Sequence, residues 1–412
     1  MRPTLERAPE GPLGVAVSGG SDSVALLLLI SSWAKESERL VKVVSVDHCL
    51  REESAAEAKF VSGLCSRLGL PHQILNWAGE KPCGNLQAQA RGARRRLIAA
   101  WAQAEGVPAV ALGHTIDDQA ETFLLRLARG SGVDGLASMR AQTVMGGLTW
   151  LRPMLGIARD DLRSWLRASG VHWIEDPSNS DFRFDRVRVR SALDDFAGIG
   201  LTRRRLAETA HRLQLARDAL EASTRDLSLS CVAFGAFGDV TIDPRSFATG
   251  PEELRTRLLA SVLRWVGGQE YRPRFKPLSE LEKSITRGDL GGGTTLHGCV
   301  LRQRDGRVVV RREPSVPIPP VPLSARVWDR RWRFIGSADS APNWTIGALG
   351  RLGLASLKDW RKTGAARETL LSTPAVWRGN RLIAAPLVER ANGFEFQLFG
   401  FPSDIAVTCH SD

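Results

Sequence analysis

The chain has 412 residues, 43% of them hydrophobic and 25% charged, so it can bury a sizeable core in about two or three domains. Its 56 lysines and arginines against 45 acidic residues give a net charge of +11, which favours nucleic acid over a membrane as partner. The longest purely apolar run, residues 24–30, is far shorter than the about 20 residues that span a bilayer, and the N-terminus has no apolar signal core. None of the six cysteines forms a C-x-x-C pair, so we expect reduced thiols in a soluble, cytoplasmic protein.

Short apolar runs alternate with helical patterns through the first half of the chain. Strands are predicted at residues 15–17, 42–46, 72–77 and 109–112, and helices at residues 22–36, 53–68, 86–104, 116–129 and 158–169. This alternation predicts an α/β domain over residues 1–195, with a doubly wound, mainly parallel sheet covered by helices on both faces. Ligands of such sheets bind at the carboxyl ends of the strands.

The alternation stops near residue 195. A long, arginine-rich amphipathic helix is predicted at residues 201–227, followed by hairpin-like segments and two further helices as far as residue 312. We therefore expect a mostly helical middle domain over residues 196–312. Residues 313–324 hold five prolines in twelve positions, which predicts an extended linker, and residues 325–412 should form a small α+β module.

The first predicted strand ends in "SGGSDS", residues 18–23. A glycine turn between a strand and a helix leaves backbone N–H groups pointing at one spot, where the helix dipole adds partial positive charge. With three serine hydroxyls beside it, this stretch predicts a phosphate cradle that differs from the Walker loop, since no Gly-Lys-Ser/Thr follows. Asp22 would repel a phosphate unless a cation lay between them, which indicates Mg²⁺. Ordinary helix capping by Ser21 or Asp22 is the alternative.

Two more polar clusters follow predicted strands of the same sheet. Asp47 and His48 come after the second strand, and "LGHTIDDQAET" comes after the fourth. Asp118 and Glu121 are three residues apart at a helix start and so share a face. Thr115 with Asp118 also resembles a capping box, and both roles can coexist. Because the three clusters meet at one edge of the sheet, we expect them to form one site.

Arginines gather in four further stretches, at residues 91–96, 183–190, 203–205 and 302–312. In "FRFDRVRVRSAL", Arg186, Arg188 and Arg190 would share one face of a strand, whereas Arg183, Arg186 and Arg190 would share one face of a helix. Either geometry gives a basic stripe that could contact nucleic acid phosphates in a salt-sensitive way. A solvated surface is the alternative.

Several of these motifs together resemble a known family. "SGGSDS" resembles the pyrophosphate loop of the N-type ATP pyrophosphatases, which split ATP between its α and β phosphates. Within that superfamily, "VDHCLR", "ARGARRRL", "LGHTIDDQAETFLLRLARGSG", "LRPML" and "IEDPSN" are similar to motifs of the tRNA(Ile)-lysidine synthetases, over about residues 14–190. The last module, with "ETLLSTPAVWRGNRLIAAPLV", loosely resembles the C-terminal domain of that family.

The resemblance implies an ATP-dependent, AMP-forming ligase that acts in two steps. The wobble cytidine of a CAU-anticodon tRNA(Ile) is first adenylated by ATP, with release of pyrophosphate. The ε-amine of free L-lysine then displaces AMP to give lysidine. The family also suggests that a homodimer is possible, and that the middle domain and the C-terminal module contact tRNA.

The resemblance and the chemistry together suggest a role for each candidate residue. ATP would be bound by Ser18, Gly19, Gly20, Ser21, Asp22, Ser23, Arg91 and Arg94. Mg²⁺ would be held by Asp22 and Asp117, and lysine by Asp118 and Glu121. The base for the lysine amine stays open among Asp47, His48 and His114. The tRNA would be bound by Arg183, Arg186, Arg188, Arg190, Arg203 and Arg204.

Other classes of protein remain as alternatives. A tRNA 2-thiolation enzyme of the same superfamily would typically use paired cysteines and an iron–sulfur cluster, and the missing C-x-x-C argues against it. An enzyme that amidates an acid with ammonia would leave the basic half of the chain unexplained. A non-catalytic RNA-binding protein with a degenerate nucleotide pocket is disfavoured by the intact "SGGSDS" and by Asp117 and Asp118.

Overall fold

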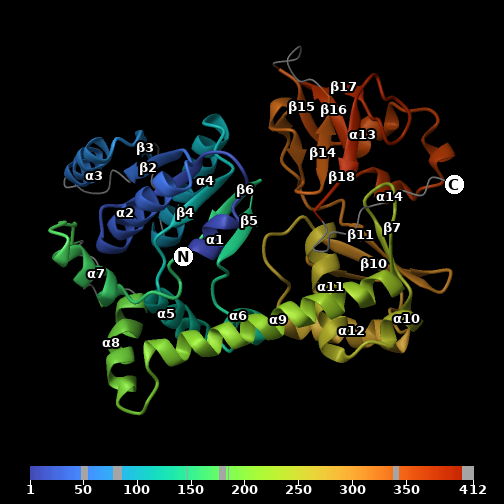
Figure 1. The fold of residues 1–412 in the computed structure, drawn as a ribbon. Helices are drawn as coiled ribbons and strands as arrows, with labels where there is room; N and C mark the ends of the chain where they lie inside the picture. Colours follow the sequence, from blue (N-terminus) through green and yellow to red (C-terminus); the bar gives the residue numbers. More distant parts are fainter. Residues whose placement is uncertain are drawn as a thin grey trace. The chain divides into compact units, whose positions relative to one another are not determined.

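The structure is a computed structural model that describes residues 1–47, 54–77, 86–145, 147–175, 182–183, 185–336 and 343–400. Two compact units, residues 1–218 and 219–412, divide the chain within helix α9 (Arg203–Cys231; Figure 1). Within the described ranges, no helix is both long and apolar enough to cross a membrane.

A six-stranded sheet forms the centre of the first unit. Its strands, in spatial order, are β3 (His72–Asn76), β2 (Val41–Asp47), β1 (Leu13–Ala16), β4 (Ala109–Leu112), β6 (Leu148–Leu151) and β5 (Gln142–Met145). All neighbours pair in parallel except β5, which pairs antiparallel with β6. The predicted mainly parallel α/β sheet is therefore confirmed.

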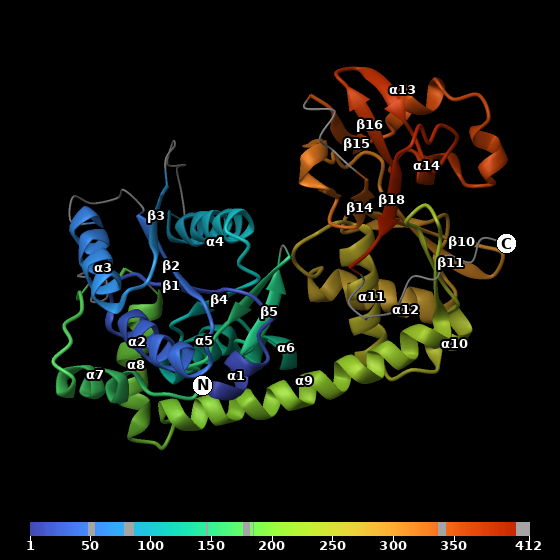
Figure 2. The same ribbon diagram turned by 45° about the horizontal axis from the view of Figure 1, so that its top comes forward.

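Helices cover both faces of this sheet. The unit contains α1 (Arg2–Glu6), α2 (Ser21–Glu36), α3 (Ser54–Leu68), α4 (Leu86–Ala104), α5 (Ile116–Leu127), α6 (Val133–Leu136), α7 (Arg159–Ala168), α8 (Asp185–Ala197) and the start of α9. Side chains alternate across the strands, so Val43 packs with α2, α3 and α7, while Val44 packs with α4 on the opposite face. Figure 2 shows α2 and α4 on opposite sides of the sheet.

The strand order places the candidate site. From β1 the chain winds outward to β2 and β3, and then crosses back to β4 on the other side of β1. The direction of winding thus reverses between β1 and β4, which is where open α/β sheets bind ligands. Residues 18–23 follow β1 and residues 114–118 follow β4, so two predicted clusters meet at this point.

Helix α8 and the first turns of α9 pack on α5. Leu193 of α8 and Leu206 and Ala210 of α9 share a buried apolar cluster with Ala120 and Phe123 of α5. This cluster holds α8 beside the helix that follows β4, so arginines of α8 reach the same end of the sheet.

The described residues of the second unit form three antiparallel sheets. The first sheet has the strand order β7 (Val232–Phe234), β8 (Val240–Ile242), β11 (Arg307–Arg312), β10 (Cys299–Arg304) and β9 (Thr294–Leu296). The second has the order β12 (Val321–Pro322), β15 (Thr345–Ala348), β16 (Pro374–Arg378) and β17 (Arg381–Ala384). The third has the order β13 (Val327–Trp328), β14 (Trp332–Ile335) and β18 (Glu395–Leu398). Its helices are α10 (Pro244–Ala248), α11 (Glu252–Val266), α12 (Phe275–Arg287), α13 (Gly350–Ala355), α14 (Arg367–Leu370) and the 3₁₀ turns η2 (Leu323–Ala325) and η3 (Trp360–Thr363).

One apolar core extends through this second unit. It joins residues of α11, such as Leu263, to residues of the last module, such as Phe396. The proline-rich segment belongs to it as well, since β12 pairs with β15 and Leu323 is buried. The predicted domain boundaries at residues 195, 312 and 324 stay predictions. The structure places residues 219–412 in one compact unit.

A buried ion cluster ties the middle of the chain to the last module. The Asp329 carboxylate is 3% exposed and lies 3.1 Å from Nη2 of Arg312 and 2.8 Å from Nη2 of Arg331. Arg331 also donates to the Gly238 carbonyl at 2.8 Å. Two guanidinium groups therefore share a single carboxylate in a dry environment, and loss of that carboxylate would leave both charges uncompensated.

We therefore expect Asp329→Asn to lower the free energy of unfolding by about 3–5 kcal/mol, because breaking a buried ion pair strands its partner. Urea unfolding followed by circular dichroism measures this. The matched control is Asp305→Asn, whose carboxylate is 90% exposed beside Arg304, and which should change stability by less than about 1 kcal/mol. Equal effects of the two variants would contradict a structural role for the cluster.

Candidate active site

A cavity of about 740 Å³ lies at the carboxyl ends of β1, β4 and β6. Its volume is within the range of small-ligand sites, which is about 300–1,000 Å³. In the described part of the chain, nine arginines line it: Arg91, Arg94, Arg95, Arg152, Arg159, Arg163, Arg186, Arg190 and Arg203. Such a lining suits a ligand with several negative charges.

The β1–α2 loop forms one wall of the cavity. Gly19 has φ +91°, and a Cβ at this position would lie 2.7 Å from Cδ1 of Ile174, so the loop requires glycine here. The Ile174 N–H donates to the Gly19 carbonyl at 2.9 Å. Ser23 Oγ accepts from the Ser18 N–H at 3.2 Å and donates to the Gly20 carbonyl at 2.9 Å. These contacts fix the loop without using a ligand.

The first turn of α2 is left open for an anion. Its N-cap residue is Gly20, and no side chain caps the helix within the described structure. The capping alternative for Ser21 and Asp22 is therefore wrong: Ser21 Oγ donates to Asp22 at 3.1 Å, and Asp22 pairs with Arg159. The N–H groups of this turn, with the helix dipole behind them, can bind phosphate.

Gly113 brings the loop after β4 against this turn. A Cβ at Gly113 would lie 3.0 Å from the Asp22 carbonyl oxygen and 3.2 Å from Cα of Ser23. Only a residue without a side chain lets the two backbones approach so closely. The sequence analysis missed this glycine, which brings together the clusters of the first and fourth strands.

Asp118 forms the predicted capping box and also lines the cavity. Its Oδ2 accepts from the N–H and the hydroxyl of Thr115, at 2.9 and 3.0 Å, which forms the capping box of α5. The same oxygen lies 3.5 Å from Nη2 of Arg159, inside the cavity. Burial would raise the pKa of Asp118, but Arg159, His114 and the Thr115 N–H outweigh it and lower that pKa. Asp118 is therefore an anion at neutral pH.

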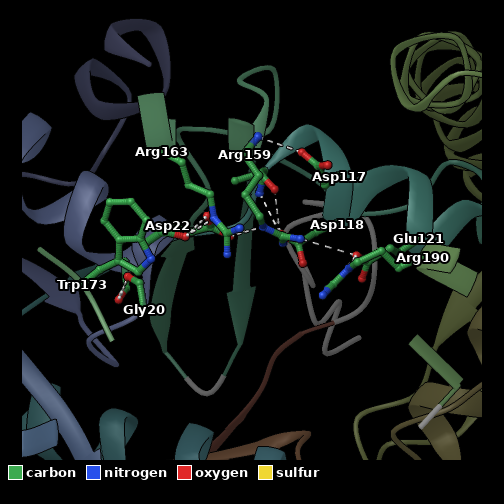
Figure 3. A network of polar contacts seen from close by, with 12 residues as sticks. Gly20, Asp22, Asp117, Asp118, Glu121, Arg159, Arg163, Trp173 and Arg190 are labelled. Carbon is green, nitrogen blue, oxygen red and sulfur yellow. Dashed lines mark hydrogen bonds and ion pairs between the residues drawn. The ribbon is translucent and has the colours of Figure 1, made fainter. Parts of the chain in front are cut away.

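Arg159 is the centre of the polar network, and the sequence analysis did not single it out. Figure 3 shows it between Asp22 on one side and Asp117 and Asp118 on the other. Its Nε lies 2.8 Å from Oδ2 of Asp22, and its Nη1 lies 3.7 Å from Oε1 of Glu121. Burial raises the pKa of Asp22, although Arg159 opposes this shift.

Asp117, predicted to hold a metal with Asp22, is engaged elsewhere. Its Oδ2 accepts from the Arg159 N–H at 2.8 Å, which satisfies the first turn of α7. Its Oδ1 lies 3.2 Å from Nε of Arg203 on α9. In the described ranges, no group of three or more histidine, cysteine or acidic side chains could hold a metal ion. Asp22, on the first turn of α2, lines the cavity beside the phosphate loop.

Glu121 lies at the back of the network. It is 1% exposed, and its Oε1 accepts from Nε of Arg190 at 2.9 Å. Its Oε2 is buried and has no hydrogen-bond partner among the described residues. Burial raises the pKa of Glu121, and Arg190 opposes this shift.

Residues 185–197 form helix α8, so the strand alternative for "DRVRVR" is wrong. Arg186 and Arg190 share the face of α8 that lines the cavity, and Nη1 of Arg186 lies 4.0 Å from Oδ1 of Asp118. Arg188 is exposed and pairs with Asp185. Arg183, which precedes the helix, is also exposed. The arginines of this stretch thus divide between the cavity and the surface.

Two of the remaining candidates, Arg91 and Arg94, come from α4 and line the cavity. Arg204 and Asp47 are not in its lining, and exposed Arg204 pairs with Glu208 on α9. Asp47 is the last residue of β2, whereas His48 is outside the described residues.

His114 lines the cavity, and its Nδ1 is buried with no hydrogen-bond partner in the described structure. Burial lowers the pKa of His114 to about 4, so its ring is neutral at pH 7. A neutral imidazole can accept a proton, but only weakly at this pKa.

Comparisons with known proteins agree with this geometry. The PP-loop domain family matches residues 2–195, so the fold and the loop after β1 define a domain of the ATP-using PP-loop class. A tRNA(Ile)-lysidine synthase of Ruegeria pomeroyi is 42% identical over 97% of this chain and 94% of its own length. One of Wolbachia pipientis is 33% identical over 92% and 89%, and one of a Bradyrhizobium species is 38% identical over 77% and 92%. The chain belongs to the tRNA(Ile)-lysidine synthase family, which confirms the resemblance of its motifs.

Among solved structures, the U34-tRNA thiolase NcsA from Methanococcus maripaludis with its 4Fe–4S cluster aligns with a TM-score of 0.45 and 16% identity. The alignment covers 52% of this chain and 75% of the thiolase chain. This likeness is too distant to bear on function.

The low pKa of His114 makes stability depend on pH. The unfolded chain binds this proton near pH 6.5 and the folded chain only near pH 4, so stability falls as the pH falls between these values. The unfolding free energy of the wild type should fall between pH 7 and pH 5. We expect this fall to be about 1–2 kcal/mol smaller in His114→Gln, which lacks the titrating ring. Urea unfolding at both pH values measures this.

His172→Gln is the matched control, because His172 is exposed. It should keep the pH dependence of the wild type. If the His114 variant also kept it, the buried neutral imidazole would be refuted.

Proposed function

We propose that this protein is an ATP-dependent ligase that converts the wobble cytidine of a CAU-anticodon tRNA(Ile) to lysidine. The observation that carries the proposal is the meeting of an anion-binding loop with two buried carboxylates of α5: Asp118, which lines the same cavity, and Glu121, which is buried beside it. The loop suits the phosphates of a nucleotide, and the carboxylates suit an amine. Family membership over nearly the full chain supports the same reaction.

In the first step, O2 of the cytidine attacks the α-phosphorus of ATP, and pyrophosphate leaves. Residues 18–23 and the first turn of α2 hold the phosphates, and Arg91 and Arg94 face them from α4. Positive groups fixed before the reaction stabilise the charge that develops on the leaving pyrophosphate. A target base must leave its stack to enter such a cavity, and an anticodon loop makes this easy.

Magnesium fits the chemistry of one side chain here. Mg²⁺ in proteins takes one or two carboxylates together with substrate phosphates and water. Asp22 offers a carboxylate on the first turn of α2, next to the phosphates, where its partners are the Ser21 hydroxyl and Arg159. Asp117 instead holds the backbone N–H at the start of α7 and the side chain of Arg203. We therefore assign the ion to Asp22, where it would neutralise the phosphates when bound.

In the second step, the ε-amine of lysine attacks C2 of the cytidine, and AMP leaves. Asp118 and Glu121 bind the ammonium group of lysine that does not react. The reacting amine must lose its proton, because lysine is charged at neutral pH. Among the candidate bases, the structure puts His114 in the cavity, and Asp47 and His48 remain the other candidates.

The tRNA is bound by arginines outside the cavity. Arg183, Arg188 and Arg204 are exposed and close in sequence to the cavity residues of α8 and α9. Arg186, Arg190 and Arg203 line the cavity, so they would meet the target nucleotide and not the wider backbone. We place the reaction in the cytoplasm, and the possible homodimer stays a prediction.

Mass analysis of tRNA(Ile) after incubation with ATP and isotopically labelled L-lysine tests the function. We expect the tRNA to gain one labelled lysyl group, with AMP and pyrophosphate formed only when both tRNA and lysine are present. Methionine tRNA, which has the same anticodon before modification, is the control and should stay unchanged. A gain of sulfur, or binding of tRNA without any gain in mass, would contradict the proposal.

Asp22→Asn should slow adenylation by about 100-fold or more, because the cation that neutralises the phosphates loses its carboxylate. Pyrophosphate release during a single turnover measures this step. Asp161→Asn is the control, because Asp161 is an exposed acid on α7 outside the cavity lining. Near-normal adenylation by the Asp22 variant would refute the magnesium assignment.

A further inference from the structure

Among the described residues, the three carboxylates that contact Arg159 already have cationic partners before any ligand binds. These carboxylates are Asp22 and Asp118, which line the cavity, and Glu121, which is buried beside Asp118 on α5. Three guanidinium groups compensate them, from Arg159, Arg186 and Arg190. His114 is neutral at pH 7. A lysine ammonium group approaching this cluster therefore meets no net negative charge to attract it.

Arg159 differs from the other two cations because it contacts all three carboxylates. It lies 2.8 Å from Asp22, 3.5 Å from Asp118 and 3.7 Å from Glu121. Its side chain is 15% exposed, so it fills the space between these acids (Figure 3). The guanidinium thus stands where an ammonium group that bridged Asp118 and Glu121 would lie.

Glu121 retains one unused acceptor. Its Oε2 is buried in a side chain that is 1% exposed, and none of the described residues donates a hydrogen bond to it. A buried carboxylate oxygen without a donor costs free energy, which a bound ammonium group would recover. The acceptor is thus present, but the cation beside it is already in place.

We propose that Arg159 keeps the amine site closed until the nucleotide binds, so that ATP must bind before lysine. The inference rests on the proposed function. Arg159 begins α7 beside Asp22, and Arg163, one turn further on, reaches Ser21 Oγ of the phosphate loop at 3.3 Å. A triphosphate bound on that loop carries more negative charge than Asp22 and draws the guanidinium away from Asp118 and Glu121. Each of these two acids then keeps one guanidinium partner, Arg186 for Asp118 and Arg190 for Glu121, and the space that Arg159 occupied is free for an ammonium group.

Arg159 is therefore a positioning residue that sets the order of binding. The nucleotide gains a cation at the same moment as the amine site loses one, so each ligand favours the other. By linkage, lysine must then increase the affinity for nucleotide by the same factor. A purely structural role for Arg159 would not couple lysine binding to nucleotide binding, so this reciprocity distinguishes the two.

Isothermal titration of the full chain with L-lysine tests the order in the wild type. We expect at least tenfold tighter binding when α,β-methylene-ATP and Mg²⁺ are present than when they are absent. Titrating the nucleotide analogue with and without lysine should give the same factor. Equal lysine affinity with and without the analogue would overturn the proposal, as would lysine binding that appears only after tRNA is added.

Arg159→Gln tests the residue itself. Without the guanidinium, lysine should bind in the absence of nucleotide at least tenfold more tightly than to the wild type, and the dependence on nucleotide should disappear. Arg167→Gln is the matched control, because Arg167 is an exposed arginine of the same helix that lies over the Trp173 ring and outside the cavity lining. It should keep the dependence. Two variants that behave alike would refute the role of Arg159.

The outcomes also separate this inference from the proposed function. Lysine that binds equally well with and without nucleotide, in a protein that still makes lysidine, contradicts the binding order alone. Failure of lysine to bind under every condition, together with no labelled product, contradicts the proposed function and the inference with it. Should Arg159→Gln fail to fold, as judged by circular dichroism, the wild-type titrations still decide the order.

Discussion

The structure of the site depends on one electrostatic requirement: carboxylates that leave water must have counter-charges. Asp118 and Glu121 are buried on the first turns of α5, and their partners come from α7 and α8, far along the chain. Each of these helices is itself held by apolar packing, α7 on the face of α2 and α8 on α5. The ion pairs therefore compensate the buried charges, while the apolar clusters hold the helices against the sheet and against one another.

The parts of this site that are formed by residues adjacent in the sequence could be predicted. The strands and helices that the sequence predicts in the first unit have ends that differ from the observed ones by at most two residues, because their apolar periodicity is strong. The short elements α1, α6, β5 and β6 are not predicted. The phosphate loop was found because strand, glycines and hydroxyls are adjacent in "SGGSDS". Strand order then brought the loop and Asp118 together, as parallel sheets require. The mainly parallel sheet and the family could both be predicted from such local patterns.

Contacts between distant segments could not be predicted in this way. Arg159 carries no local signal that separates it from the arginines of other helices, and its importance appears only when α7 docks beside Asp22. Arg190 was assigned to tRNA because it belongs to a basic stripe, yet it points at Glu121. In the second half, short strands from both sides of the proline-rich segment share one core, which composition alone does not reveal.

The hydrogen bond from the Arg159 N–H to Asp117 affects both the start of a helix and the position of a cavity cation. Asp117 satisfies the backbone N–H of Arg159, so the start of α7 and the location of the guanidinium are set by the same carboxylate. An ordinary helix cap could be exchanged for another with little consequence outside the helix. Here such an exchange would shift the cation that three acids share. Laboratory evolution for thermal stability should therefore leave Asp117 unchanged. A side chain that stabilised the start of α7 better would still move the Arg159 guanidinium, and selection for turnover would reject it.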